Sequence, residues 1–416
     1  PFTVANSLRF DDGSSDFLNA TNSTPTNNDK CTLSVWVKRS ALGGTKSIIG
    51  FHTDDNNRGN LVFDSDKLEV RIFDSGSTTT QLTTNQVFRD ISAWYHIVLS
   101  VDTTQSTASS RVRIYVNGSE VTDFGTETNP SQNQNFGLNN SSVVLKIGQK
   151  GENNDYFDGY MAEFVFIDGQ QLAPTSFGQF NADSPTVWEP IDVTGLTFGT
   201  NGFYLDFEDS SALGNDVSGN NNDFTANNLT SVDQSTDTCS NNGCTWNTLI
   251  PTSSTFTQGN LVYTANSSNP VFGSLTTFGV TSGKWYAECK YVSGSNHYGI
   301  IGVADEVFAG INDLGTATNT DLGKTGSALG SDPADCTVAY VINTGKIRNN
   351  NNNQNYGSGG GDGDIINIAL DRDNRKVYFG INGTYENSGN PGSGSNGFDL
   401  SSQVTGDTYF LGVTND

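Results

Sequence analysis

The chain has 416 residues, enough for two or three domains with cores of ordinary size. Its 45 Asp and Glu residues outnumber its 21 Lys and Arg residues, and the formal net charge is −24 at pH 7. Such a charge excludes the broad basic surface that nucleic acids and anionic membranes require, and no apolar run approaches the roughly 18 residues that cross a bilayer.

The composition favours strands and tight turns over helices. Met occurs once, whereas Gly occurs 46 times and Phe 25 times. Phe and Tyr are spread through short segments of alternating polarity, which is typical of strands. We therefore predict an all-β protein. We interpret the start at Pro1 as following a removed initiator Met rather than a cleaved signal peptide.

Residues 1–190 contain a succession of short segments of strand character, separated by Gly, Asn and Asp. In "RVRIYVNGSEV", Val112, Ile114 and Val116 share one face of the predicted strand. The Asn-Gly pair that follows them supplies the positive φ angles of a two-residue hairpin turn. Many short strands at this spacing predict a two-sheet sandwich.

The stretch "YFDGYMAEFVFIDGQQL", residues 156–172, combines carboxylates and aromatic side chains with two Asp-Gly pairs. Asp-Gly pairs mark turns, and the apolar run between them has the length of one strand. We interpret the stretch as a structural strand with a turn at each end. Glu163 is therefore not predicted to be catalytic.

Residues 231–254 are rich in Ser, Thr, Asn and Asp, which predicts a linker between two domains. A second domain is predicted over residues 255–416. In "RKVYFGING" the apolar residues Val377, Phe379 and Ile381 alternate before another Asn-Gly turn. The run "RNNNNNQNYGSGGGDGD" lacks apolar side chains to offset the entropy of ordering, so we expect a flexible loop over residues 349–363.

The segments "SLRFDDGSSDFL", "CTLSVWVKRS", "WYHIVLSVD", "RVRIYVNG" and "YFDGYMAEFVFIDGQQLAPTSFGQ", in that order, resemble the concanavalin A-like, laminin-G-like jelly roll. The places of its closing pattern are filled by Phe157, Asp158, Gly159, Glu163, Phe164, Leu172 and Phe177. The segment "FYLDFEDSSALGNDVSGNNNDFTANN" resembles the part that opens such a domain, although here it comes late. We therefore expect residues 197–230 to supply a permuted strand of the first sandwich.

The segments "SGKWYAECKYVSGSNHYGIIGVAD" and "GDIINIALDRDNRKVYFGINGTYENSG" resemble the SPRY domain, another two-sheet sandwich. That family closes with a further strand after the part matching "TYFLGVTND", so the second domain is expected to lack its last strand and to leave a sheet edge open.

The pair of domains resembles virion-associated proteins of marine bacteriophages. This resemblance implies a fibre or decoration protein on the virion surface, assembled as a homo-oligomer, with a trimer as the first expectation. Its implied partners are a host-surface glycan or protein and other virion proteins.

Catalytic motifs are not evident in the sequence. Glucanases with the concanavalin A-like fold carry an E-x-D-x-x-E string, whose carboxylates face the cleft, and this chain has none. Asp206 and Glu208 share a face of one segment, but two such carboxylates are typical of a solvated strand edge. We expect no enzymatic activity. Glycan hydrolysis and a purely structural role in a fibre or capsid are kept as alternatives to host recognition.

Two kinds of binding site are considered. Calcium prefers carboxylate and carbonyl oxygens, and candidate ligands are Asp11, Asp12 and Asp16 in one loop and Asp158 in an Asp-Gly turn. The alternative is a solvated acidic turn. Sugar rings stack on aromatic side chains, and candidate contacts, each with core or rim packing as its alternative, are Trp188, Trp246, Tyr298, Tyr356 and Tyr385.

The five cysteines show no paired CxxC spacing, which disfavours a zinc site. Cys239 and Cys244 lie in one predicted loop. Cys31, Cys289 and Cys336 lie in strand-like segments and are expected to be buried as small apolar side chains.

Overall fold

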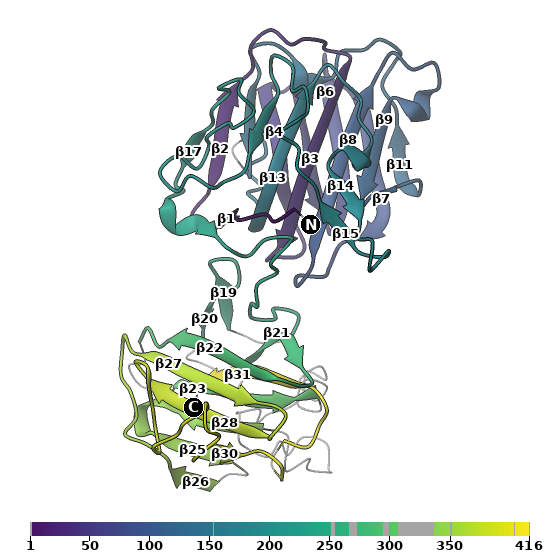
Figure 1. Ribbon diagram of the computed structural model, residues 1–416. Coiled ribbons are helices and arrows are strands. Elements are labelled where there is room, and N and C mark those ends of the chain that lie inside the picture. The colour runs from purple at the N-terminus through teal and green to yellow at the C-terminus, as the bar shows by residue number, and fades with distance from the viewer. Residues whose placement is uncertain are drawn as a thin grey trace. The chain divides into compact units, whose positions relative to one another are not determined.

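The computed structural model describes residues 2–152, 154–250, 254–265, 273–293, 299–306, 337–349, 352–402 and 404–415. The chain divides into two compact units, Pro1–Gly243 and Cys244–Asp416, each built from antiparallel sheets (Figure 1). The all-β prediction is confirmed. Within the described part of the chain, no helix has the length and apolar character to cross a membrane.

Two eight-stranded sheets form the N-terminal unit. The first, sheet A, has the order β10 (Ser119–Glu120), β9 (Val112–Val116), β8 (Trp94–Asp102), β3 (Lys30–Arg39), β13 (Gly159–Asp168), β1 (Ser7–Phe10) and β18 (Gln234–Ser235), with β16 (Phe203–Leu205) also on β13. The second, sheet B, has the order β11 (Phe124–Thr128), β7 (Ser77–Val87), β6 (Lys67–Asp74), β5 (Asn57–Asp64), β4 (Thr45–Asp54), β12 (Val144–Ile147), β2 (Phe17–Thr21) and β17 (Thr225–Asn227).

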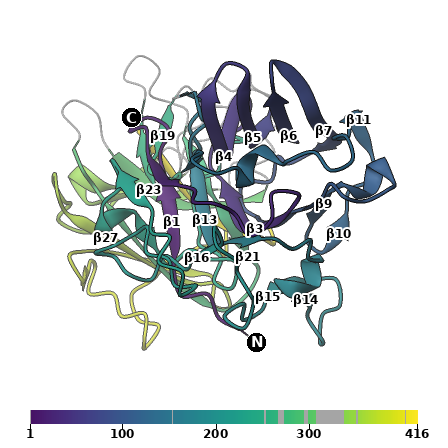
Figure 2. The same ribbon diagram turned by 90° about the horizontal axis from the view of Figure 1, so that it is seen from above.

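The two sheets pack face to face around one apolar core (Figure 2). Leu33 and Val35 from sheet A and Leu61 and Phe63 from sheet B are all at most 1% exposed. A hairpin of β14 (Gly178–Phe180) and β15 (Trp188–Pro190) and short 3-10 helices complete the unit. These helices are η1 (Ala108–Ser110), η2 (Gly137–Asn139), η3 (Pro174–Ser176) and η4 (Ser231–Asp233).

The outer face of sheet A is also buried. Val165 and Ile167 of β13 pack under Phe177, Val193 and Phe198, which lie on the segment that follows this strand. All ten residues of β13 are buried in consequence. This agrees with the interpretation of residues 156–172 as a structural strand, and its two Asp-Gly turns have glycines at φ +143° and +91°.

Strand β13 changes partner halfway along its length. A bulge interrupts its pairing with β3 between Ala162 and Val165. Before the bulge its other edge pairs with β1, and after it Phe164–Phe166 pair with β16. The segment expected to supply a permuted strand therefore lies in the first sandwich, where Phe203 stacks on Phe166 at 5.6 Å between ring centroids.

The boundary between the two units, after Gly243, falls within residues 231–254, but residues 231–243 are part of the N-terminal unit and not a linker. Strand β18 pairs with β1, and residues up to Gly243 belong to the N-terminal unit. The buried ammonium group of Lys38 explains why this segment belongs to the N-terminal unit. Lys38 Nζ donates to Asp237 Oδ2, Asn242 Oδ1 and the Gly243 carbonyl, each at 2.8 Å, and so holds this polar segment against sheet A.

The C-terminal unit contains two further sheets. One has the order β21 (Ser274–Val280), β31 (Tyr409–Asn415), β23 (Gly299–Asp305), β24 (Thr337–Val341), β25 (Lys346–Asn349) and β26 (Asn352–Asn355). The other has β22 (Lys284–Lys290), β27 (Ile365–Asp371), β28 (Lys376–Ile381) and β29 (Thr384–Tyr385), with β30 (Phe398–Asp399) also on β28. A hairpin of β19 (Thr255–Thr257) and β20 (Val262–Thr264) and the 3-10 helix η5 (Ile342–Thr344) accompany them.

One expectation for this unit needs correction. The Asn-rich run is not a loop throughout, because β26 pairs with β25 and Tyr356 is only 7% exposed. Strand β31, after which a further strand was expected from the resemblance, pairs with β21 on one side and β23 on the other, and the missing last strand with its open edge stays a prediction. The Asn382-Gly383 turn forms as predicted, with φ angles of +50° and +84°.

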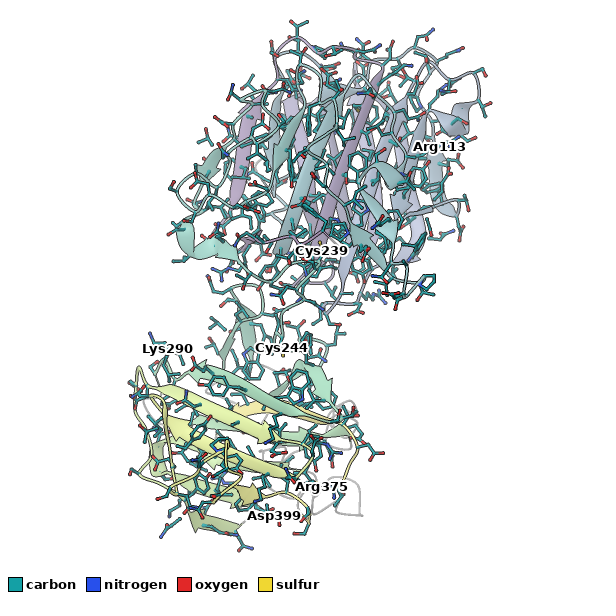
Figure 3. The ribbon with its side chains drawn as sticks, in the orientation of Figure 1. Arg113, Cys239, Cys244, Lys290, Arg375 and Asp399 are labelled. Atoms are coloured by element: carbon teal, nitrogen blue, oxygen red, sulfur yellow. The ribbon has the colours of Figure 1, made fainter. Side chains whose placement is uncertain are left out.

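We predict that Lys38→Met destabilises the N-terminal unit by about 3–5 kcal/mol, because it leaves the Asp237 carboxylate buried without its cation. The side chains of Lys38 and Asp237 are 1% and 9% exposed. The measurement is urea unfolding of the full chain. Arg113→Met is the control, since the Arg113 and Glu120 side chains are 38% and 39% exposed and such pairs contribute less than about 1 kcal/mol (Figure 3). Equal effects of the two substitutions would contradict the prediction.

Candidate functional site

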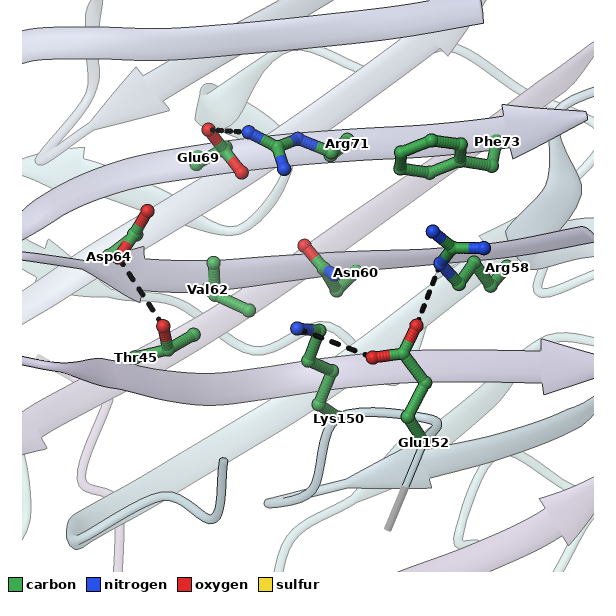
Figure 4. Close-up of a pocket in the computed structure, with 10 residues that line it drawn as sticks. All are labelled: Thr45, Arg58, Asn60, Val62, Asp64, Glu69, Arg71, Phe73, Lys150 and Glu152. Carbon is green, nitrogen blue, oxygen red and sulfur yellow. Dashed lines mark hydrogen bonds and ion pairs between the residues drawn. The ribbon is translucent and has the colours of Figure 1, made fainter. Parts of the chain in front are cut away.

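A polar pocket lies on the outer face of sheet B, formed mainly by β5 and β6. Strand alternation sends Leu61 and Phe63 into the core and the intervening side chains outward. Arg58 lies opposite Phe73, and Asn60 opposite Arg71, in the register of the two strands. The pocket has a volume of about 160 Å³ and is lined by Thr45, Arg58, Asn60, Val62, Asp64, Glu69, Arg71, Phe73, Lys150 and Glu152 (Figure 4). We call it the β5–β6 pocket.

Ion pairs fix most of the charged groups of the β5–β6 pocket. Arg58 Nε lies 2.7 Å from Glu152 Oε1, and Lys150 Nζ lies 3.4 Å from Glu152 Oε2. The Arg58 guanidinium also stacks over the Phe73 ring at 4.1 Å from its centroid. Because one face of the guanidinium stacks on Phe73 and its Nε edge pairs with Glu152, the side chain is held in one orientation.

Glu69 is the most deeply buried carboxylate of this pocket, with a side chain only 6% exposed. Its Oε2 accepts hydrogen bonds from Thr83 Oγ1 at 2.7 Å, Gln81 Nε2 at 3.0 Å and Arg71 at 3.1 Å. Asn60 Oδ1 and Arg71 Nε are buried and have no hydrogen-bond partner among the described residues. An orphaned buried polar atom costs about 1–3 kcal/mol, so a bound hydroxyl or water that reached it would be stabilising.

The arrangement suits a small polyhydroxylated ligand. The volume of the β5–β6 pocket is below the roughly 300–1,000 Å³ of pockets that bind drug-sized ligands. The pocket therefore fits a group of the size of one sugar residue. Paired cations and carboxylates present donors and acceptors at fixed positions, and the Phe73 ring adds an apolar surface. Sequence reasoning missed this pocket, because its residues come from separate strands and a loop and no local motif joins them.

The aromatic side chains proposed from the sequence are divided between the two units. Trp188 belongs to the N-terminal unit and is 8% exposed, and its Nε1 donates to His96 Nδ1 at 2.8 Å. The other end of the His96 ring meets Ser34 Oγ at 2.8 Å, and burial lowers the pKa of His96 to about 3. Trp188 is therefore a packing residue.

The remaining aromatic candidates belong to the C-terminal unit. Tyr356 lies in its core, where its hydroxyl accepts from the Phe379 amide at 3.3 Å. Trp246 is half-buried beside Tyr263. Tyr385 is also half-buried, and its ring meets that of Tyr378 edge-on at 6.3 Å. Tyr298 lies outside the described residues.

The acidic loop proposed for calcium is held by its own hydrogen bonds. Asp11 Oδ1 accepts from the Gly13 amide, and Asp16 accepts from the Asp11 amide and from Ser14 Oγ. Asp12 pairs with Lys46. Within the described ranges, no set of three or more His, Cys, Asp or Glu side chains is arranged to hold a metal ion.

The structure does bring Asp158 close to this loop. Burial, followed by the charges of Asp12 and Asp11, raises the pKa of Asp158 to about 7. A bound divalent cation would favour the ionised carboxylate and would therefore lower the pKa of Asp158. The surroundings of Asp158 are therefore those of a carboxyl group that gains a proton readily.

Cysteine placement follows the expectation of burial for Cys31 but only in part for Cys289. Cys31 is buried and Cys289 is half-buried, and desolvation raises the pKa of the Cys289 thiol to about 11. Cys239 and Cys244 are free thiols on either side of the unit boundary (Figure 3). Cys336 lies outside the described residues.

Glu163 lies in the bulge of β13, away from the β5–β6 pocket. It has φ +50° and is 6% exposed, and its Oε2 accepts from the Tyr204 hydroxyl at 2.7 Å. Burial raises the pKa of Glu163 to about 7. The charges of Asp206, Glu208 and Asp192 add to this rise of the Glu163 pKa.

Comparison with known proteins supports the fold of the first unit. Residues 12–172, less than half of the chain, match the family described as the concanavalin A-like lectin/glucanases superfamily. This match confirms the predicted concanavalin A-like fold there. No curated protein matches the chain.

Several solved structures show a distant likeness. The heptameric SAP-like pentraxin of Limulus polyphemus is 16% identical, with 42% of this chain and 80% of that chain covered and a TM-score of 0.30. A putative carbohydrate binding protein of Bacteroides ovatus is 17% identical, with 55% and 59% covered and a TM-score of 0.37. The SPRY domain of human HERC1 is 19% identical, with 34% and 72% covered and a TM-score of 0.23. These values carry no argument about activity, and the SPRY assignment of the second unit stays a prediction.

We predict that Glu163→Gln changes the pH dependence of stability. Glu163 ionises near 4.5 when unfolded and near 7 when folded, so the folded state loses stability as pH rises between these values. At pH 8 this loss is on the order of 3 kcal/mol, and the Gln variant avoids it. Urea unfolding at pH 4 and pH 8 measures the effect. The exposed Glu127, changed to Gln, serves as the control, and equal pH profiles for all three proteins would refute the prediction.

We predict that calcium leaves the thermal stability unchanged, because Lys46 already neutralises Asp12 and the loop carboxylates accept protein hydrogen bonds. The measurement is the Tm with millimolar CaCl₂ and with a chelator. A ligand that binds only the folded state must raise the Tm. A rise with calcium that the chelator reverses would restore the calcium hypothesis.

Proposed function

We propose that this protein recognises a glycan through the β5–β6 pocket and does so without enzymatic activity. The observation that carries the proposal is the pocket's combination of fixed ion pairs with the Arg58–Phe73 stack, on the part of the chain that matches a lectin/glucanase family. Binding residues on a rigid sheet need little reorganisation, which favours recognition of weakly interacting sugars.

The absence of an E-x-D-x-x-E string from the sequence supports a non-enzymatic role. In the pocket, Glu69 is bonded to three donors and Glu152 is paired with two cations, so both carboxylates are engaged in the wall. Hydrolysis of a bound polysaccharide, measured as release of reducing ends, would overturn this part of the proposal.

The resemblance of the two-domain sequence to virion-associated proteins supports a more specific setting. We propose a fibre or decoration protein on a virion surface, assembled as a trimer, which contacts a glycan of the host surface. The acidic chain suits this placement, since a net charge of −24 keeps a surface protein soluble. Immunogold labelling of virions and sedimentation of the purified chain test the location and the oligomeric state.

We predict that Arg58→Ala lowers the affinity for a glycan found on a glycan array at least tenfold. The substitution removes the stack on Phe73 and leaves Glu152 without its guanidinium partner. A tenfold loss corresponds to about 1.4 kcal/mol, which is the scale of one charge-assisted hydrogen bond. The measurement is titration of the full chain with the array hit.

Two controls make this test specific. Arg113→Ala removes an arginine from β9 of the other sheet and is expected to leave affinity unchanged. Phe73→Leu keeps an apolar side chain but removes the aromatic ring, and it should weaken binding less than Arg58→Ala does. If the array shows no hit, or if Arg58→Ala binds as the unchanged protein does, the pocket is not the recognition site.

A further inference from the structure

A second group of aromatic and polar side chains lies on the outer face of the C-terminal unit. In the register of β22, β27, β28 and β29, Glu288 lies opposite Asn367, Asn367 opposite Gly380, and Gly380 opposite Tyr385. The adjacent row contains Tyr286, Ala369 and Tyr378. We call Tyr286, Glu288, Asn367 and Tyr385 the Tyr286 patch.

Hydrogen bonds fix the polar atoms of the patch. The Tyr286 hydroxyl donates to Glu288 Oε1 at 2.5 Å and accepts from Asn367 Nδ2 at 2.7 Å. Asn367 is 2% exposed, and its Oδ1 accepts from the Gly383 amide at 2.7 Å. Because a buried amide anchors the hydroxyl and the carboxylate, Tyr286 is held in place although it lies at the surface.

The same side chains remain open to solvent. Tyr286 is 58% exposed, and Glu288 is exposed as well. Among the described residues, the hydrogen bonds of Glu288 are made by Oε1, so Oε2 keeps its capacity to accept. Burial, followed by the charge of Glu288, raises the pKa of Tyr385, which indicates that these two groups are neighbours across the glycine position.

We propose that the Tyr286 patch is a second saccharide-binding site, which takes an uncharged sugar ring. The ring stacks on Tyr286, its hydroxyls donate to Glu288 Oε2, and Tyr385 borders it. An exposed aromatic ring whose orientation is already fixed loses little conformational entropy on binding. The side chains between the tyrosines are small, Ala369 and Gly380, which leaves the tyrosine rings and the carboxylate as the prominent groups.

Charge selects the class of ligand. The Glu288 carboxylate and the net charge of −24 repel an acidic sugar or a phosphate group. A cationic peptide is attracted by the carboxylate, but Lys284, two positions before Tyr286 on the same face of β22, opposes it, with its ammonium 3.5 Å from Asp371. A neutral ligand with many hydroxyl groups is repelled neither by the Glu288 carboxylate nor by the Lys284 ammonium.

The patch is independent of the β5–β6 pocket, because the two sites belong to different units. One chain would therefore carry two saccharide sites. Two weak sites on one chain bind a repetitive polysaccharide with an avidity that exceeds either affinity.

The test uses the full chain with Arg58→Ala, so that the contribution of the β5–β6 pocket is lowered at least tenfold. The probes are immobilised mannan, galactan and glucan, with polygalacturonate as the acidic comparison and a lysine-rich peptide as the cationic one. We expect retention on at least one neutral polysaccharide, at least a tenfold loss with Tyr286→Ala, and a smaller loss with Tyr286→Phe. Lys290→Ala, at the end of β22, is the control and leaves binding unchanged (Figure 3).

The control for folding is the Tm of each variant. We expect it to be unchanged, because each substitution is at an exposed side chain of the C-terminal unit. Loss of all neutral-polysaccharide binding in Arg58→Ala, or equal binding by Tyr286→Ala, overturns the patch proposal. Binding of only the peptide or polygalacturonate through Tyr286 overturns it as well. If Tyr286→Ala abolishes binding while Arg58→Ala has no effect, the patch stands and the β5–β6 pocket fails.

Discussion

A strand buried on both faces constrains the whole N-terminal unit. Both faces of β13 must be covered, and both of its edges must find hydrogen-bond partners. Strand β3 satisfies one edge, whereas β1 and β16 share the other on either side of the bulge. The segments that cover the outer face of β13 come from the 170s to the 200s of the chain, whereas sheet B presents charged side chains outward at the β5–β6 pocket.

The charged groups of the unit fall into two kinds with different consequences. Lys38 and Asp237 lie inside the fold, and their interaction holds a polar segment in place of an apolar one. Arg58, Lys150 and Glu152 lie at the surface, about a quarter exposed, where a ligand can compete with water for the same donors and acceptors. Burial therefore separates the groups that maintain the fold from those available for recognition.

Local patterns predicted local structure well. The alternation of Val112, Ile114 and Val116 and the Asn-Gly turns are found as expected, because hairpins depend on neighbouring residues. Trp188 and Tyr356 were not distinguishable from surface platforms, since their burial depends on distant partners such as His96 and the Phe379 amide. The β5–β6 pocket and the clamp around Lys38 depend on contacts between residues far apart in sequence, which a single sequence does not display.

The position of β31 in the C-terminal unit has a consequence for how that unit is made. In the described part of the C-terminal unit, strands β21 and β23 are joined through β31, which comes more than 100 residues after them. A nascent chain in which β21 and β23 have already been synthesised must wait for this central strand, and loop closure over such a span is slow. Until translation delivers it, both strands present unpaired edges, and chaperone holding or rapid synthesis would protect them from self-association.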